Sequence, residues 1–223
     1  MTLAPQLWIA GYGPGLGESL AVRFARDGWR VLALSRQAPA APVAGGTHVA
    51  LDLLGPDAGA RLAALQVEHG APAALIYNVG VFRRGLPAAL HEDELRACWE
   101  GMVLGAFRAV QAVLPAMLAA GSGTLILSGA TASVRGGAEF AAFASAKFAL
   151  RGLAQSLARA YQPRGVHVVH TILDGVIDGS ARSGTYTARL DPAAIADTYW
   201  QLVQQQPGAW THELDLRGAD EPF

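Results

Sequence analysis

The sequence contains a single cysteine, Cys98, so no disulfide can form within the chain. A chain without disulfides fits a reducing compartment. A cysteine nucleophile needs a neighbouring histidine and a lowered thiol pKa. Cys98 is better explained as a small apolar residue packed in a helix. We therefore expect a cytoplasmic protein in which this thiol has no chemical role.

Charged residues are also scarce, at 16% of the chain with a net charge of -1. This balance gives no basis for binding nucleic acid or an anionic membrane. No uninterrupted apolar run reaches the length of about 20 residues that spans a bilayer. Residues Met1 to Ala10 lack the basic region of a signal peptide and run into glycines, so we expect a first strand there. No metal site is expected.

The chain is instead rich in apolar residues, at 52% of 223 residues, and it has 26 glycines. Short apolar runs alternate with segments in which apolar residues recur at helical spacing. The predicted strands are Leu7–Ala10, Arg30–Ser35, Thr47–Leu51, Ala73–Tyr77, Thr124–Ser128, Val166–Leu173 and Trp210–Leu216. The predicted helices are Gly17–Asp27, Asp57–His69, Glu92–Ala120 as one helix or two with a kink at Pro115, Glu139–Tyr161 and Pro192–Gln204.

Strands that are nearly continuous apolar runs are typical of parallel strands buried on both faces. Their alternation with helices predicts a doubly wound parallel sheet of about seven strands, with helices on both faces. We therefore expect residues 1–223 to form a single α/β domain of the Rossmann, dinucleotide-binding type, a three-layer sandwich.

The first predicted strand leads into Gly11-Tyr12-Gly13-Pro14-Gly15-Leu16-Gly17, and a helix follows. A tight turn at a helix N-terminus exposes backbone N–H groups that can hold a diphosphate, helped by the positive end of the helix dipole. A plain tight turn would use the same glycines. The strand before the turn and the helix after it favour nucleotide binding.

The end of the second strand is where nucleotide-binding proteins of this type recognise the ribose. An acidic residue there would accept from the ribose 2′-OH and favour NAD. This chain has Ser35 and Arg36 instead. A hydroxyl next to a planar guanidinium suits a 2′-phosphate. We therefore expect NADP(H) rather than NAD(H), unless Arg36 is only a solvated surface residue.

Several motifs, in this order, make nearly the whole chain resemble the short-chain dehydrogenase/reductase family. They are the glycines, Asp52-Leu53, Asn78-Val79-Gly80, the segment Ala142 to Lys147 in place of Tyr-x-x-x-Lys, and Asp174-Gly175 in place of Pro-Gly. The resemblance implies an NAD(P)-dependent oxidoreductase, with Asp52 and Leu53 at the adenine. The implied cofactor-binding residues are Gly11, Gly15, Leu16, Gly17, Ser35, Arg36, Asp52, Leu53, Asn78, Gly80, Lys147, Gly175 and Val176.

The same resemblance implies that Lys147 bonds the nicotinamide ribose and lowers the pKa of a neighbouring acid. In the family that acid is a tyrosine one helical turn earlier, but this chain has Phe143. The family's substrate-orienting serine falls at Ala130, or at Gly129 if strand ends are matched, and its helix asparagine falls at Met102. Lys147 alone of these four groups is retained.

Other residues are candidates to replace the missing groups. If the loop shifts, Ser128, Thr131 or Ser133 could orient the substrate. Asp174 could act as an acid or base if buried, whereas His170 is better explained as a packed core histidine. The family's carboxamide-binding threonine falls at Gly179, next to Ser180, and the loop Gly179 to Leu190 is expected to shape the substrate pocket.

A positioned acid is worth roughly 10²–10⁴ in rate, so three functions stay open. The first is an oxidoreductase that takes its proton from Lys147, Ser133, Thr131, Tyr12 or water, or whose substrate, such as an activated alkene, is protonated by solvent. The second is a catalytically silent NADP(H)-binding regulatory or sensor protein. The third is a non-redox enzyme that uses a bound nucleotide structurally, with Asp174 or His170 as base. The first is favoured because the cofactor positions and Lys147 are present.

The helices at Glu92 to Ala120 and Glu139 to Tyr161 carry apolar residues around much of their circumference. The resemblance implies that these two helices pair across a two-fold axis. We expect a homodimer or homotetramer that acts on a small-molecule substrate, unless the apolar faces are all core within one chain.

Overall fold

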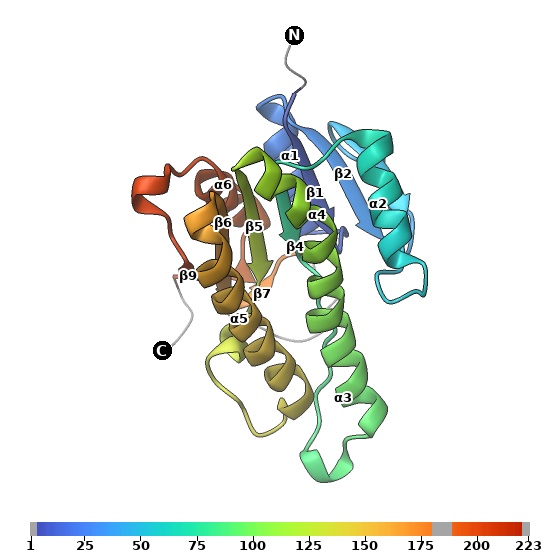
Figure 1. Ribbon diagram of the computed structural model, residues 1–223. Helices are drawn as coiled ribbons and strands as arrows, with labels where there is room; N and C mark the ends of the chain where they lie inside the picture. Colours follow the sequence, from blue (N-terminus) through green and yellow to red (C-terminus); the bar gives the residue numbers. More distant parts are fainter. Residues whose placement is uncertain (1–3, 180–188, 220–223) are drawn as a thin grey trace.

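The computed structural model describes residues 4–179 and 189–219, and its centre is a parallel sheet (Figure 1). Seven strands form this sheet in the order β3-β2-β1-β4-β5-β6-β9. Their bounds are β1 Gln6–Ala10, β2 Arg30–Ser35, β3 Gly46–Ala50, β4 Ala74–Tyr77, β5 Gly123–Ser128, β6 Val166–Asp174 and β9 Glu213–Arg217. The predicted doubly wound α/β sheet of seven strands is confirmed. A separate pair, β7 Val176–Ile177 and β8 Arg189–Leu190, was not expected.

Helices cover both faces of the sheet (Figure 1). Their bounds are α1 Leu16–Arg26, α2 Ala58–His69, α3 Glu92–Trp99, α4 Gly105–Ala120, α5 Ala141–Tyr161 and α6 Pro192–Val203. One hydrophobic core packs α2, α4 and α5 on the sheet, and a second packs α1 and α6 on the other face. The central strands β1, β4 and β6 are buried along their whole length, and β1 and β4 are accordingly almost continuous apolar runs, whereas β6 also carries buried polar side chains.

The segment Glu92–Ala120, predicted as one helix or two, contains two helices, and the break between them is not at Pro115, which lies inside α4. A π-helical turn, Glu100–Leu104, separates α3 from α4. The hydroxyl of Tyr77 donates a hydrogen bond to the carbonyl of Gly101 at this turn. By length and hydropathy the segment Glu92–Ala120 is the one candidate membrane span among the described residues, and half of its most apolar window is buried inside the fold.

Candidate nucleotide-binding and catalytic site

The turn between β1 and α1 depends on glycine. Gly11 and Gly15 have φ angles of +85° and +82°, in the left-handed region that favours glycine. A Cβ at Gly11 would also lie 2.7 Å from the amide nitrogen of Val79. Among the described residues, no side chain caps the start of α1 at Gly15. The first amides of this helix are therefore available to a diphosphate.

This turn lies where the strand order reverses, because β1 has β2 on one side and β4 on the other. In open α/β sheets, ligands bind at the carboxyl ends of the strands at such a point. Asn78 and Gly80 follow β4 at the same edge, and the Asn78 amide donates to the Ala10 carbonyl at 2.8 Å. The structure thus brings the predicted residues after β1 and β4 together.

Ser35 and Arg36 lie at the end of β2, at the same edge of the sheet. The Ser35 hydroxyl donates to the Gln37 carbonyl at 2.8 Å. Its oxygen is 2.9 Å from Nε2 of His48, which is then the donor, since a hydroxyl has only one proton. Arg36 is exposed and has no bonding partner within residues 4–179 and 189–219. Its guanidinium is open to a ligand.

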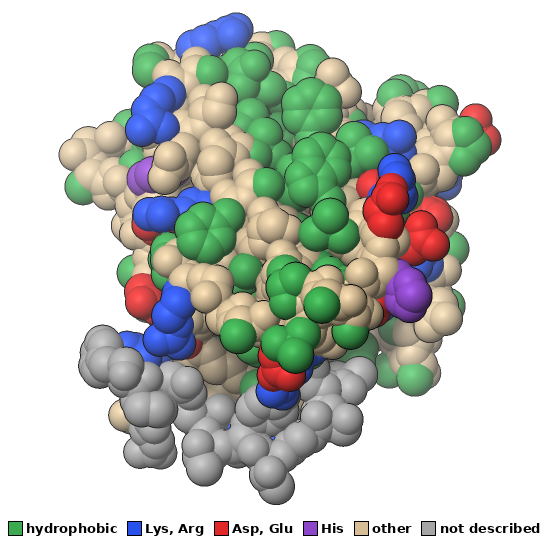
Figure 2. All heavy atoms as spheres, turned by 90° about the horizontal axis from the view of Figure 1, so that it is seen from below, with side chains coloured by type: hydrophobic (Ala, Val, Ile, Leu, Met, Phe, Trp, Pro, Cys, Tyr) green, Lys and Arg blue, Asp and Glu red, His purple; other side chains and the backbone are tan. Residues whose placement is uncertain are grey.

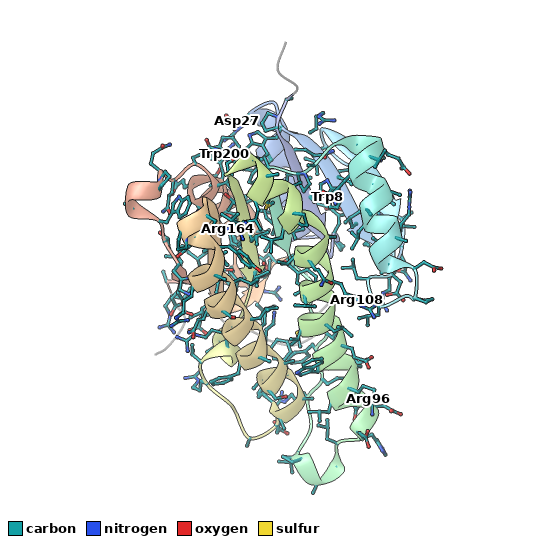
Figure 3. All side chains as sticks on the ribbon, in the orientation of Figure 1. Trp8, Asp27, Arg96, Arg108, Arg164 and Trp200 are labelled. Atoms are coloured by element: carbon teal, nitrogen blue, oxygen red, sulfur yellow. The ribbon has the colours of Figure 1, made fainter. Side chains whose placement is uncertain are left out.

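Asp52 and Leu53 form a turn after β3. The Asp52 carboxylate accepts from the Leu54 amide at 2.9 Å, and the Leu53 side chain is buried. Arg108 reaches this turn from the side of α4 that faces α2 (Figure 3), and it donates to the Leu53 carbonyl at 2.9 Å. No sequence motif predicted a role for this arginine.

Lys147 on α5 is 4% exposed, and its Nζ donates to the Ser128 carbonyl at 2.7 Å. The Phe143 ring lies 5.7 Å from Nζ, within the range of a cation–π interaction. Phe143 packs edge-on against Phe82, with ring centroids 5.2 Å apart, in an apolar cluster that also holds buried Met102. Ala130 packs against the same cluster. The Phe143 ring therefore lies between this apolar cluster and the Lys147 ammonium.

Two of the hydroxyls that the sequence offered as substitutes are already bonded. The Ser128 hydroxyl lies 3.0 Å from the hydroxyl of Tyr199 on α6, on the opposite face of the sheet from α5. Thr131 donates to the Asp174 carboxylate, whose second oxygen accepts from Arg217 at 2.7 Å. Asp174 is buried at the end of β6 and is paired with a cation.

Ser133 belongs to a row of four buried or half-buried polar side chains. Its hydroxyl is 3.2 Å from Nε2 of His170, whose Nδ1 is 3.2 Å from the Glu213 carboxylate. Arg151 binds that carboxylate with two nitrogens, at 2.6 and 2.7 Å. Burial lowers the pKa of His170 to about 4. The neutral ring donates from Nδ1 to Glu213 and accepts from Ser133, so the row is consistently bonded.

This row has the order of a Ser–His–acid triad, but Ser133 is fully buried. Its oxygen also accepts the Ala130 amide at 3.1 Å. A nucleophile must be reachable, so the row holds the loop after β5 in place and does not attack a substrate. A Cβ at Gly129 would lie 2.3 Å from Nε2 of His170, so the histidine also explains the glycine at that position.

The remaining predicted residues lie along β6 and the segment after it. Gly175 has a φ angle of +145°, Val176 is buried in β7, and a Cβ at Gly179 would lie 3.3 Å from Cα of Gly15. Ser180 and most of the loop Gly179 to Leu190 lie outside the described residues.

Cys98 is buried, and burial raises the pKa of its thiol. The described residues hold no group of three potential metal ligands.

The strand order and the glycine turn define a Rossmann-type nucleotide-binding protein. The profile of the short chain dehydrogenase family matches residues 6–188. The chain belongs to this family of NAD(P)-dependent oxidoreductases.

Proteins of known name and structure are similar to this chain. Human 17-beta-hydroxysteroid dehydrogenase type 1 is 33% identical in an alignment of 174 residues that covers 72% of this chain and 53% of that protein. The 3-oxoacyl-(acyl-carrier-protein) reductase FabG of Vibrio cholerae is 29% identical in an alignment of 177 residues that covers 76% of this chain and 72% of that protein. A short-chain dehydrogenase from Rhodopseudomonas palustris superposes with a TM-score of 0.81 at 35% identity, covering 97% of this chain and 99% of that one. The chain spans about half the length of the human relative.

Proposed function

We propose that this protein binds NADP(H) and is an oxidoreductase for a small molecule, without an ionisable side chain at the position of the family's catalytic tyrosine. The glycine turn carries the proposal, because Gly11 and Gly15 leave the first amides of α1 uncapped at the switch point of the sheet. Exposed Arg36 at the end of β2 supports the 2′-phosphate of NADP(H) over NAD(H). Lys147 matches the lysine of the family and would hold the nicotinamide ribose, while the bound nicotinamide would supply or accept the hydride.

The proton source distinguishes this proposal from the ordinary chemistry of the family. Hydride transfer to a carbonyl leaves an alkoxide that needs a proton, and Phe143, Ala130 and Met102 have no group to give one. Ser133 is buried in its row, and Thr131 donates to Asp174. Because these two hydroxyls are already engaged, we favour Lys147 as the proton donor, or a substrate that solvent protonates, such as an activated alkene.

Tyr12 offers little as a replacement acid. Burial, and then the charge of Glu18, raise the pKa of its hydroxyl. The Tyr12 ring packs in the core beneath α1 and α6, whereas Lys147 belongs to α5 on the other face.

A second candidate function is a regulatory protein that binds NADP(H) without turnover. It is favoured by the apolar cluster around Phe143, where Phe82 and Met102 pack and the side chains are carbon and sulfur. A non-redox enzyme is disfavoured, because Asp174 is paired with Arg217 and the lowered pKa of His170 makes it a weak base inside the core.

Calorimetry with NADPH, NADP⁺, NADH and NAD⁺ tests the proposal. We expect heat of binding with all four and tighter binding of the two phosphorylated forms. NADPH absorbance is then followed with a panel of aldehydes, ketones and activated alkenes. Turnover of alkenes but not carbonyls supports the solvent-protonated reaction. Binding without any turnover supports the regulatory protein, and no binding of any nucleotide contradicts both.

A further inference from the structure

Arg108 on α4 bridges to the turn after β3. Its Nη1 donates to the Leu53 carbonyl at 2.9 Å and lies 3.4 Å from the Gly55 carbonyl. The guanidinium therefore binds the backbone on both sides of Leu54. Hydrogen bonds from a charged donor are stronger than those between neutral groups.

Apolar packing between this turn and α4 is incomplete. A cavity of ≈ 360 Å³ lies between the turn before α2, at Gly55 and Pro56, and α4, at Arg108 and Gln111. One turn further along, Gln66 on α2 donates to the Ala112 carbonyl of α4 at 2.8 Å. Polar bonds thus hold the two segments together across a hollow, and Arg108 makes the bond next to the turn.

We propose that Arg108 is a positioning residue for the adenine end of the cofactor. This inference rests on the proposed nucleotide binding, in which Asp52 and Leu53 contact the adenine. The Asp52 carboxylate already accepts from the Leu54 amide, which fixes one side of the turn. Arg108 fixes the other side through the Leu53 carbonyl. Without Arg108 the turn must be ordered when the nucleotide binds, and that ordering lowers the affinity.

The test compares probes that contain different parts of the cofactor. NADPH contains the whole molecule, 2′,5′-ADP contains only the adenosine half, and reduced nicotinamide mononucleotide contains only the other half. For Arg108→Ala we expect about tenfold weaker calorimetric binding of NADPH and of 2′,5′-ADP, the effect of losing one hydrogen bond from a charged donor. Binding of the mononucleotide is expected to stay unchanged.

Two further variants make the result specific. Arg108→Lys keeps the charge but lacks the planar fork, so we expect an intermediate loss of affinity for NADPH and 2′,5′-ADP. This variant replaces Arg108→Ala in the test if the alanine variant does not fold. Arg61→Ala is the matched control, because Arg61 on α2 pairs with the Glu68 carboxylate at 2.6 Å and not with the turn. We expect this control to bind all three probes as the unchanged protein does.

Each other outcome overturns a defined claim. If the unchanged protein binds NADPH and Arg108→Ala binds 2′,5′-ADP equally well, the role of Arg108 is wrong and the nucleotide site stands. An equal loss of mononucleotide binding means general loosening of the fold and also overturns the role. If the unchanged protein binds no probe, the proposed function itself fails.

Discussion

Phe143 and Lys147 lie one helical turn apart on α5, with the ring 5.7 Å from the ammonium nitrogen. A hydroxyl added to this ring would join the same face of the helix as Lys147. We predict that Phe143→Tyr combined with Ala130→Ser raises NADPH-dependent reduction of simple carbonyls by roughly 10²–10⁴, the worth of a positioned acid. The rate of NADPH oxidation with the carbonyl panel measures this.

Phe140→Tyr is the matched control for that experiment. Phe140 precedes α5 and lies in the same aromatic corner, with its ring centroid 5.9 Å from that of Phe82. The same added hydroxyl at Phe140 is expected to leave the rate unchanged. If the double variant gains nothing, the surrounding pocket has diverged together with the two replaced residues.

Single residues of the site were partly predictable. The glycines, Ser35, Arg36, Asn78 and Lys147 all lie at the carboxyl edge of the sheet, because each follows a strand or faces one from α5. Ser128 was a poor candidate for a reason already visible in the sequence. Side chains alternate along a strand, so Ser128 shares its face with Ile126 in the core under α1 and α6.

At the scale of elements, the central strands β1 and β4 were predictable because burial on both faces makes each an almost continuous apolar run. The π-helical turn was not predictable, since it depends on a tertiary contact. Tyr77 reaches Gly101 from β4, and a Cβ at Gly105 would lie 2.4 Å from the Tyr77 hydroxyl. Pro115 sits inside α4 without ending it, although it removes one N–H from the helix.

The row from Arg151 to Ser133 joins α5, β9, β6 and the loop after β5, and it too was not predictable. Its residues are far apart in the chain, and only the pairing of His170 with Glu213 across β6 and β9 brings them together. The structure supports the expectation that His170 is a packed residue, and it adds specific partners on both ring nitrogens.

Acid is predicted to destabilise the protein through His170. Burial lowers its pKa in the folded state from 6.5 to about 4. The unfolded chain therefore takes up this proton first as the pH falls, and stability is lost between pH 6.5 and 4. The loss from this residue is about 3 kcal/mol at most. Above pH 6.5 the residue contributes no pH dependence.

Urea unfolding at pH 7.5, 6.0 and 4.5 measures this effect. In His170→Gln the fall in unfolding free energy across this range is expected to be smaller than in the unchanged protein. His91→Gln, which changes an exposed histidine, should leave the fall as it is. The Glu213 carboxylate, whose pKa is lowered mainly by its bond to Arg151, remains in both variants. If the unfolding free energy of His170→Gln falls with pH as much as that of the unchanged protein, the prediction is contradicted.

For the whole molecule, we propose association into a homodimer or homotetramer through α3, α4 and α5. Trp99, Phe107 and Phe148 on these helices are 47%, 45% and 44% exposed. Viewed from the carboxyl edge of the sheet, hydrophobic side chains gather in the upper and middle part of the face, with charged ones toward its sides and below them (Figure 2). Exposed apolar surface of this kind marks an interaction site.

Sedimentation analysis of the purified chain tests the association. We predict an oligomer at micromolar concentration and a shift toward monomer in Phe148→Glu, because the new charge would have to be buried in the contact. Val67→Glu, on α2 and 88% exposed, is the control and should not change the sedimentation. If the unchanged protein sediments as a monomer, the proposed association through these rings is wrong.

The last strand, β9, is an edge strand of the sheet, yet its side chains are linked by hydrogen bonds to the loop beside Lys147. Glu213 is linked to it through His170 and Ser133, and Arg217 through Asp174 and Thr131, each across a directly paired position of β6. Local unfolding of β9 is thus expected to disturb turnover before the hydrophobic core unfolds. We therefore expect tags or fusions attached after residue 217 to disturb the candidate site beside Lys147.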